Sequence, residues 1–309
     1  MPDIVKGMSE FAPVVLFVFK RVDSARGLIE SLLNNREASS TDLYIFSDGP
    51  RNENETAPVS KVREYIHSIE GFKSVNITCA PVNKGLANSI INGVTSVLNT
   101  HGKVIVVEDD LLVSNNFLQF MNQALEYYKE NEKVLSISGF TYPIKKRTGD
   151  DIYLTGRICS TGWATWVEKW LKVDWKVQDF NSFMQNRTEQ RRFNRMGSDL
   201  TGLLYKQMQG KVDSWAIRWC YHQFKNDLHT VYPTVSKVKI FGLDEMATHT
   251  NLKWNRYETV LDESGNIQFN FTNEVQLDPF YVKQFVDRYS ISKRAKYKMM
   301  NYITSAGFL

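Results

Sequence analysis

Three consecutive acidic residues, Glu108-Asp109-Asp110, follow the short apolar segment 103–107. Adjacent carboxylates repel one another and raise each other's pKa unless a cation neutralises them. Carboxylate oxygens suit Mg²⁺ and Mn²⁺, which keep coordination positions open for substrate phosphates. The triplet therefore predicts a divalent-metal site, and the alternative is a set of acids at a helix N-terminus.

A second polar segment, Asn83-Lys84-Gly85, lies directly before the helical pattern of residues 86–98. Glycine lets the backbone approach a ligand closely, and a helix N-terminus directs N–H groups at anions. Lys84 adds a positive charge. The alternative is an ordinary loop with a helix cap. Because one helix separates this segment from the acidic triplet, we expect both to face one diphosphate.

Asp213-Ser214-Trp215 is a candidate for proton transfer. An apolar wall formed by an indole would raise the pKa of Asp213 and make it a better general base. The alternative is a helix N-cap followed by a core tryptophan, since Asp and Ser are frequent caps.

Aromatic side chains gather at Trp163, Trp166 and Trp170. The i, i+4 spacing of Trp166 and Trp170 favours a helix packed on the core. Trp163 either lines a sugar-binding cleft or joins the same core. His249, in a loop after Asp244 and Glu245, is either a ligand near a diphosphate or metal or a structural histidine.

The elements that would position these residues alternate between strands and helices. Strand patterns occupy residues 13–19, 43–46, 74–79, 103–107 and 134–138, and helical patterns occupy residues 25–33, 59–69, 86–98 and 116–128. This order predicts an α/β fold with a mostly parallel central sheet and helices on both faces. Ligands in such folds bind at the carboxyl ends of the strands. That rule selects four polar segments, residues 20–23, 48–51, 83–85 and 108–111.

The chain of 309 residues is long enough for one large domain with an appendage. We expect one domain over residues 1–250, with a nucleotide-binding half (1–140) and an acceptor half (141–250), and a C-terminal extension over residues 251–309. In the second half, residues 181–209 have a helical pattern and residues 230–240 a strand pattern. Asp and Ser are frequent N-cap residues, so Asp23 with Ser24 is the expected N-cap of the first helix.

Composition excludes several classes of protein. Hydrophobic residues make up 42% and charged residues 23% of the chain, which excludes global disorder. No apolar run approaches the roughly 18 residues of a membrane span. The N-terminus lacks the layout of a secretory signal, and three widely spaced cysteines suggest no disulfide framework, so we expect a cytoplasmic protein.

The net charge of +4 is unevenly distributed. Of the 38 basic and 34 acidic side chains, six basic ones and one acid lie in residues 283–309, so the remainder carries one net negative charge. A neutral body excludes a nucleic-acid footprint spread over the surface. The basic, partly apolar tail predicts either peripheral contact with the inner face of a membrane or a solvated terminal helix.

In order and spacing, these segments resemble nucleotide-sugar glycosyltransferases of the GT-A fold, in particular the N-acetylglucosaminyltransferase I type and bacterial polysaccharide glycosyltransferases. The resemblance covers residues 12–250. The segments that carry it are Val18-Phe19-Lys20-Arg21, Phe46-Ser47-Asp48-Gly49-Pro50, Asn83-Lys84-Gly85, Val107-Glu108-Asp109-Asp110, Ser160-Thr161-Gly162-Trp163-Ala164-Thr165-Trp166 and Val212-Asp213-Ser214-Trp215.

The resemblance implies an inverting hexosyl- or N-acetylhexosaminyltransferase that uses a UDP-sugar and Mn²⁺ or Mg²⁺. Its acceptor would be a glycan or a lipid-linked saccharide in bacterial surface polysaccharide synthesis. Carried over by position, Phe19 and Arg21 would bind the nucleotide or its phosphates, and Asp48 would bind the uracil edge. Asn83, Lys84 and Gly85 would contact the diphosphate. Glu108 and Asp109 would bind ribose and sugar hydroxyls, Trp163 would contact the sugar, and Asp110 with His249 would bind the metal.

Asp213 would be the catalytic base. Ser214 stands where the family has a second acid, so Asp213 is the one carboxylate at that point of the motif.

Two other classes remain as alternatives. A sugar-phosphate nucleotidyltransferase also combines an α/β sheet with a metal, but it carries a Gly-rich, Arg-containing loop after the first strand, where this chain has Lys20-Arg21-Val22-Asp23. A non-catalytic carbohydrate-binding module is the other alternative.

Overall fold

The computed structural model describes residues 11–240 and 257–305. Its strands are β1 (Val14–Val18), β2 (Asp42–Ser47), β3 (Ser74–Cys79), β4 (Lys103–Glu108), β5 (Leu111–Val113), β6 (Val134–Ser138), β7 (Ile152–Thr155), β8 (Trp163–Trp166), β9 (His229–Pro233) and β10 (Val238–Ile240).

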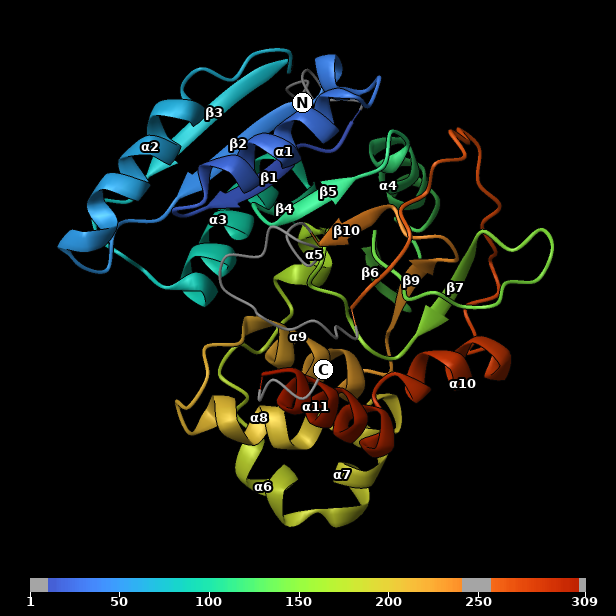
Figure 1. Ribbon diagram of the computed structural model, residues 1–309. Helices are drawn as coiled ribbons and strands as arrows, with labels where there is room; N and C mark the ends of the chain where they lie inside the picture. Colours follow the sequence, from blue (N-terminus) through green and yellow to red (C-terminus); the bar gives the residue numbers. More distant parts are fainter. Residues whose placement is uncertain (1–10, 241–256, 306–309) are drawn as a thin grey trace, which may run out of the picture.

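Its helices are α1 (Val22–Leu33), α2 (Thr56–Ile66), α3 (Leu86–His101), α4 (Phe117–Tyr127), α5 (Val167–Trp170), α6 (Phe180–Gln185), α7 (Arg187–Phe193), α8 (Leu200–Met208), α9 (Trp215–Lys225), α10 (Pro279–Asp287) and α11 (Ile291–Ser305). Figure 1 shows these elements in place.

One eight-stranded sheet, in the order β3-β2-β1-β4-β8-β6-β9-β7, forms the centre of the molecule. Strands β3, β2, β1 and β4 are mutually parallel, and β6 is parallel to β9. Strand β8 lies antiparallel between β4 and β6, and β7 is antiparallel to β9. The predicted α/β fold with a mostly parallel sheet is confirmed. Strands β5 and β10 form a separate antiparallel pair.

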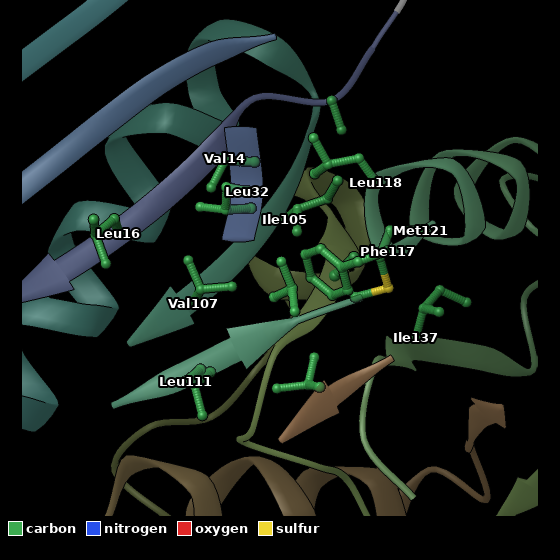
Figure 2. Packing of buried hydrophobic residues seen from close by; sticks show 14 of the residues in the cluster. Val14, Leu16, Leu32, Ile105, Val107, Leu111, Phe117, Leu118, Met121 and Ile137 are labelled. Atoms are coloured by element: carbon green, nitrogen blue, oxygen red, sulfur yellow. The ribbon is translucent and has the colours of Figure 1, made fainter. Parts of the chain in front are cut away.

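Helices cover both faces of this sheet because β1 is apolar at every position and β4 is apolar from Val104 to Val107. Successive side chains of a strand point to opposite faces. Val14 and Leu16 of β1 therefore pack in one cluster with α1, α2 and α4, whereas Val15 and Phe17 pack in another with α3 and α9. Figure 2 shows part of the first cluster, with Ile105 of β4 beside Phe117 of α4.

Several segments differ from their predicted form. Residues 230–240 do not form one strand, since β9 ends at Pro233 and β10 begins only at Val238, with an isolated bridge from Ser236 to Leu261 between them. Residues 181–209 form three short helices, α6, α7 and α8. Helix α1 starts at Val22, without a side-chain cap from Asp23 or Ser24.

The chain that follows residue 256 packs first against α4. We call residues 257–277 the clasp segment. Its Asp262 and the carbonyl oxygen of Asn266 accept hydrogen bonds from Asn116, and its Phe269 ring meets Phe120 of α4 edge-on at 5.1 Å between centroids. The clasp segment leads into α10, which buries Tyr281 and Phe285 in a third, aromatic cluster.

Candidate active site

A cavity of about 570 Å³ opens where β1, β2 and β4 end and α3 begins. Parallel strands bring their carboxyl ends to one edge of the sheet, as the sequence predicted. The cavity is lined by Phe17, Val18, Phe19, Arg21, Phe46, Asp48, Arg51, Asn83, Gly85, Leu86, Ser89, Glu108, Asp109, Asp110 and Asp213. The structure therefore brings nine of the twelve predicted site residues to one cavity.

Arg21 and Asp109 connect the ends of β1 and β4. The Arg21 guanidinium contacts Asp109 at 2.5 Å and Asp110 at 3.3 Å, and the backbone N–H of Phe19 donates to the second oxygen of Asp109 at 3.2 Å. Asp109 is 4% exposed and both its oxygens are engaged. Its first role is therefore to hold the two strand ends together, and its expected contact with donor hydroxyls stays a prediction.

Glu108 and Asp110 are the acids of the triplet that lack a full set of partners. Burial, and then the nearby carboxylates of Asp110 and Asp109, raise the pKa of Glu108 to about 8. One guanidinium faces three carboxylates at this strand end, so the site retains an excess of hard oxygen donors. Such a donor set fits Mg²⁺ or Mn²⁺ held by one or two carboxylates and by substrate phosphates.

A complete protein metal site is not part of the described structure. Within residues 11–240 and 257–305, no three His, Cys, Asp or Glu side chains come together as a metal-binding group. His249, the second predicted ligand, lies outside the described residues. The fit to a metal therefore depends on Asp110 and the acids beside it.

Asp48 organises the loop between β3 and α3. Its carboxylate accepts the backbone N–H groups of Gly49 and Lys84, both at 2.8 Å, and of Gly85 at 3.2 Å. Asn83 supports the same loop by donating to the carbonyl oxygen of Gly49 at 2.9 Å. A Cβ atom on Gly49 would lie 2.4 Å from the Val82 backbone, so this close approach requires glycine. The predicted contact of Asp48 with uracil stays a prediction.

Lys84 faces a different space. Its side chain lines a smaller neighbouring cavity of about 120 Å³ between β2, β3 and α3, and it does not line the main cavity. The structure thus separates Lys84 from the other residues predicted to meet the diphosphate.

Asp213 enters the cavity from the second half of the chain. Its Oδ2 accepts the backbone N–H of Ala87 at 3.2 Å, in the first turn of α3. Ser214 is the N-cap of α9, with its hydroxyl accepting from the N–H of Ile217 at 3.4 Å. Asp213 therefore does not cap its own helix and instead binds the start of another. The predicted N-cap followed by a core tryptophan is confirmed for Ser214 and for Trp215, which is 3% exposed. The role of Asp213 as a general base stays a prediction.

Trp163 does not reach the cavity, so its predicted place in a sugar-binding cleft is wrong. The ring is 1% exposed and lies in a cluster with Trp170, Trp215 and Trp219 at centroid distances of 5.4, 5.1 and 4.6 Å. The core position of Trp166 and Trp170 is confirmed. Their i, i+4 spacing was misleading about local structure, because Trp166 ends a strand and α5 begins one residue later.

Arg51 also lines the cavity; it lies in the predicted polar segment 48–51 but was not among the individual residues predicted for the site. The Arg51 guanidinium lies 5.1 Å from the centre of the Phe19 ring and is held by Glu55 through bonds of 3.0 and 2.7 Å. Lys20 also pairs with Glu55, at 2.8 Å. Hydrogen bonds from Arg51 and then Lys20 lower the pKa of Glu55 to about 2. The position of a basic residue directly after the Asp-Gly-Pro turn was the sequence signal that could have identified Arg51 as a residue of the cavity.

A second cavity, of about 190 Å³, adjoins the first at the Asp213–Ser214 peptide. Ser214 lines it together with hydroxyl and aromatic side chains that include Tyr142, Tyr257 and Tyr289. The hydroxyl groups of Tyr142 and Tyr289 lie 2.6 Å apart. This cavity is suited to a ligand that combines apolar faces with hydroxyl groups.

No protein-family model and no curated protein sequence matches this chain. Solved structures with partial similarity include a mannosyltransferase from Pyrobaculum calidifontis in complex with GDP-Man and Mn²⁺, at 12% identity and a TM-score of 0.35 over 54% of this chain and 48% of that chain. GalNAc-T7 with UDP, GalNAc and Mn²⁺ matches at 12% identity and a TM-score of 0.38, over 53% and 37% of the two chains.

TarS of S. aureus matches at 10% identity and a TM-score of 0.34, over 53% of this chain and 30% of that chain. The present chain thus aligns with less than half the length of each of these three proteins. Similarity of this degree does not establish a family or an activity for it.

Proposed function

We propose that this chain is a metal-dependent glycosyltransferase that moves a hexosyl or N-acetylhexosaminyl group from a UDP-sugar to an acceptor hydroxyl. One observation carries the proposal. Arg21, the acids from Glu108 to Asp110 and the carboxylate of Asp213 all line a single cavity at the carboxyl edge of the sheet. Sugar transfer needs such a set, since it combines a charged leaving group with proton removal from the acceptor.

The donor would bind on the side formed by residues 1–140. Phe19 and Arg51 offer an aromatic ring and a cation for the nucleotide, and the loop held by Asp48 presents backbone to the diphosphate. Asp110 would hold Mn²⁺ or Mg²⁺, with His249 as the second proposed ligand. When bound, the metal would neutralise charge on the departing UDP.

Asp213 would act as the general base. Among the described residues its Oδ2 bonds to Ala87, and no hydrogen bond engages Oδ1. As the acceptor oxygen forms its bond to the anomeric carbon, the bond from that carbon to the diphosphate breaks and the hydroxyl proton passes to Asp213. Attack from the face opposite UDP inverts the anomeric centre.

The second cavity, which residues between 140 and 232 line together with Tyr257 and Tyr289, supports a saccharide acceptor. Tyrosine rings pack on the C–H faces of sugars, and hydroxyl groups such as that of Ser214 bond to sugar hydroxyls. We propose a glycan or lipid-linked acceptor in bacterial surface polysaccharide synthesis. The cysteines Cys79, Cys159 and Cys220 are unpaired, which supports a site of action in the cytoplasm, with residues 283–309 at the inner membrane face.

Thermal unfolding in the presence of nucleotides tests the donor. UDP with Mn²⁺ should raise the melting temperature, because a ligand that binds only the folded state stabilises it. UDP without metal and GDP with metal should give smaller shifts. Equal shifts for all nucleotides would remove the UDP-sugar assignment.

Product analysis with a panel of UDP-sugars then tests the reaction. Release of UDP that depends on an added saccharide supports sugar transfer. Release of pyrophosphate from UTP and a sugar phosphate would instead identify a nucleotidyltransferase. Sugar binding without turnover of any donor would identify a non-catalytic module.

A further inference from the structure

Helix α11 lies on the surface of the molecule. It follows α10, which buries Tyr281 and Phe285, yet none of the α11 side chains through Tyr302 is buried. Figure 1 shows α11 beside the helices of the second half of the chain. No helix in the described residues is both long and apolar enough to cross a membrane.

The outer side of α11 carries an apolar stripe. Ile291 is 73% exposed and Met299 is 59% exposed, and Ala295 lies between them at the same i, i+4 spacing. At 3.6 residues per turn these three positions fall within about 80° of arc. Exposed apolar side chains aligned in this way mark an interaction surface rather than a random feature of the exterior.

Basic side chains border the stripe on both sides. Lys298 lies at one edge and Lys296 at the other, and both are exposed. Two further bases have partners on the protein, because Arg294 donates to the hydroxyl of Ser198 at 3.0 Å and Lys293 lies 3.6 Å from Asp287. No acidic residue follows Asp287 in the sequence, so no carboxylate of this segment offsets the outer lysines.

We propose that the outer face of α11, formed by Ile291, Ala295, Lys296, Lys298 and Met299, binds an anionic lipid bilayer surface. The apolar stripe enters the boundary between headgroups and acyl chains, and the two lysines contact anionic headgroups. Charge alone would serve a nucleic acid equally well. The phosphate backbone of a nucleic acid, however, would not bind the exposed apolar side chains of Ile291 and Met299. A bilayer surface binds both basic and apolar side chains.

The position of this face also suits the proposed transferase. Tyr289, two residues before α11, lines the cavity assigned to the acceptor. A protein lying on a bilayer through α11 would hold that cavity close to lipid-linked saccharides. Only this consequence rests on the proposed function. The proposal that α11 binds lipid does not depend on the transferase activity.

Vesicle co-sedimentation of the full chain tests the proposal. Vesicles of phosphatidylcholine with about 30% phosphatidylglycerol should pellet the protein, and added salt should weaken the binding. Vesicles of phosphatidylcholine alone should bind at least about tenfold less. Lys296→Glu with Lys298→Glu should reduce binding to the anionic vesicles by at least about tenfold, and Ile291→Ser with Met299→Ser should reduce it severalfold.

Arg36→Glu with Lys61→Glu is the matched control, since it changes the net charge equally at exposed positions on other elements. This control should pellet like the unchanged protein. Wild-type protein that stays in the supernatant, or a Lys296/Lys298 variant that pellets like wild type, would overturn the proposal. Tighter binding to single-stranded RNA than to anionic vesicles would also overturn it. Nucleotide-dependent thermal shifts, measured on the same samples, report on the transferase separately.

Discussion

Oδ2 of Asp213 accepts a hydrogen bond from the backbone N–H of Ala87 at 3.2 Å, although 126 residues separate the two in the chain. The bond joins the second half of the molecule to the first turn of α3. It also fixes the carboxylate at the edge of the main cavity, which Asp213 lines. Oδ2 thus has a structural role, whereas no hydrogen bond from the described residues engages Oδ1.

Asp213→Asn separates these two roles. The amide oxygen can still accept from Ala87, so we expect the melting temperature and the affinity for UDP with Mn²⁺ to stay close to wild type. Loss of a general base should lower turnover by at least about 100-fold. Asp213→Ala is the comparison, since it also removes the bond and should lower the free energy of unfolding by about 1 kcal/mol. Retained turnover in the Asn variant would exclude Asp213 as the base.

Gly85→Ala should weaken both the loop and the nucleotide site. Gly85 has φ +79° and ψ 154°, a conformation that is essentially restricted to glycine. Alanine should therefore lower the free energy of unfolding by about 1–3 kcal/mol. Relief of this strain would move the Gly85 N–H away from Asp48 and weaken UDP affinity.

Gly202→Ala in α8 is the control for this change. A Cβ atom at Gly202 has no neighbour within 4 Å, and the residue is helical, so alanine should raise stability by up to about 1 kcal/mol. Urea unfolding of both variants checks the pair. A Gly85→Ala protein as stable as wild type would show that the loop is not conformationally restricted.

Arg21→Met should uncouple the ends of β1 and β4. Asp109 would remain buried with the Phe19 N–H as its described partner, so unfolding should become easier by about 2 kcal/mol. UDP binding should be lost as well. Arg26→Met, in helix α1 that Arg21 precedes, removes a guanidinium that lies over the Tyr65 ring at 4.6 Å and should cost less than about 1 kcal/mol. Equal effects of the two variants would contradict the importance of the Arg21–Asp109 pair.

Protonation of the Asp262 carboxylate should lower the free energy of unfolding at acidic pH. Burial opposes its ionisation, but hydrogen bonds from Lys237 and Ser264 outweigh burial and lower its pKa to about 2. Because the pKa is lower in the folded state than in the unfolded chain, the ionised carboxylate stabilises the fold above about pH 4. This contribution, about 2 kcal/mol, is lost as the pH falls from about 4 to about 2.

Asp262→Asn should remove that acid-dependent step and lower the free energy of unfolding at pH 7 by about 3 kcal/mol, since Lys237 would stay buried without its counterion. Denaturant unfolding at pH 7 and pH 3 measures both effects. Asp227→Asn is the control, because the Asp227 side chain is 86% exposed and should matter little. An unchanged acid transition in the Asp262 variant would assign the step to another group.

The sheet and the cavity were predictable because their signals are local. An uninterrupted apolar run such as Val14–Val18 is typical of a strand buried on both faces, and a polar residue after it falls at the carboxyl edge. The bounds predicted for β3 and β6 match the structure, although polar residues alternate with apolar ones in both strands. The rule that strand ends converge then placed Arg21, Asp48 and the acidic triplet together.

The remaining features depend on contacts between distant residues. Nothing near Trp163 distinguishes a ring in a cleft from one stacked among three other tryptophans. The bond between Asp213 and Ala87 has no sequence signature, because one partner is a backbone group. The same holds for the packing of Phe269 on Phe120, which places a partly buried ring of the predicted extension against the core.

The clasp segment has a consequence for how the protein is made. Asn116, on the loop before α4, donates a hydrogen bond to the carbonyl oxygen of Asn266, 150 residues later in the chain. A ribosome must therefore synthesise the chain beyond Phe269 before this side of α4 can be covered. Nascent chains arrested before residue 257 should leave Phe120 accessible to hydrophobic dyes and chaperones, and release of the finished chain should abolish that binding.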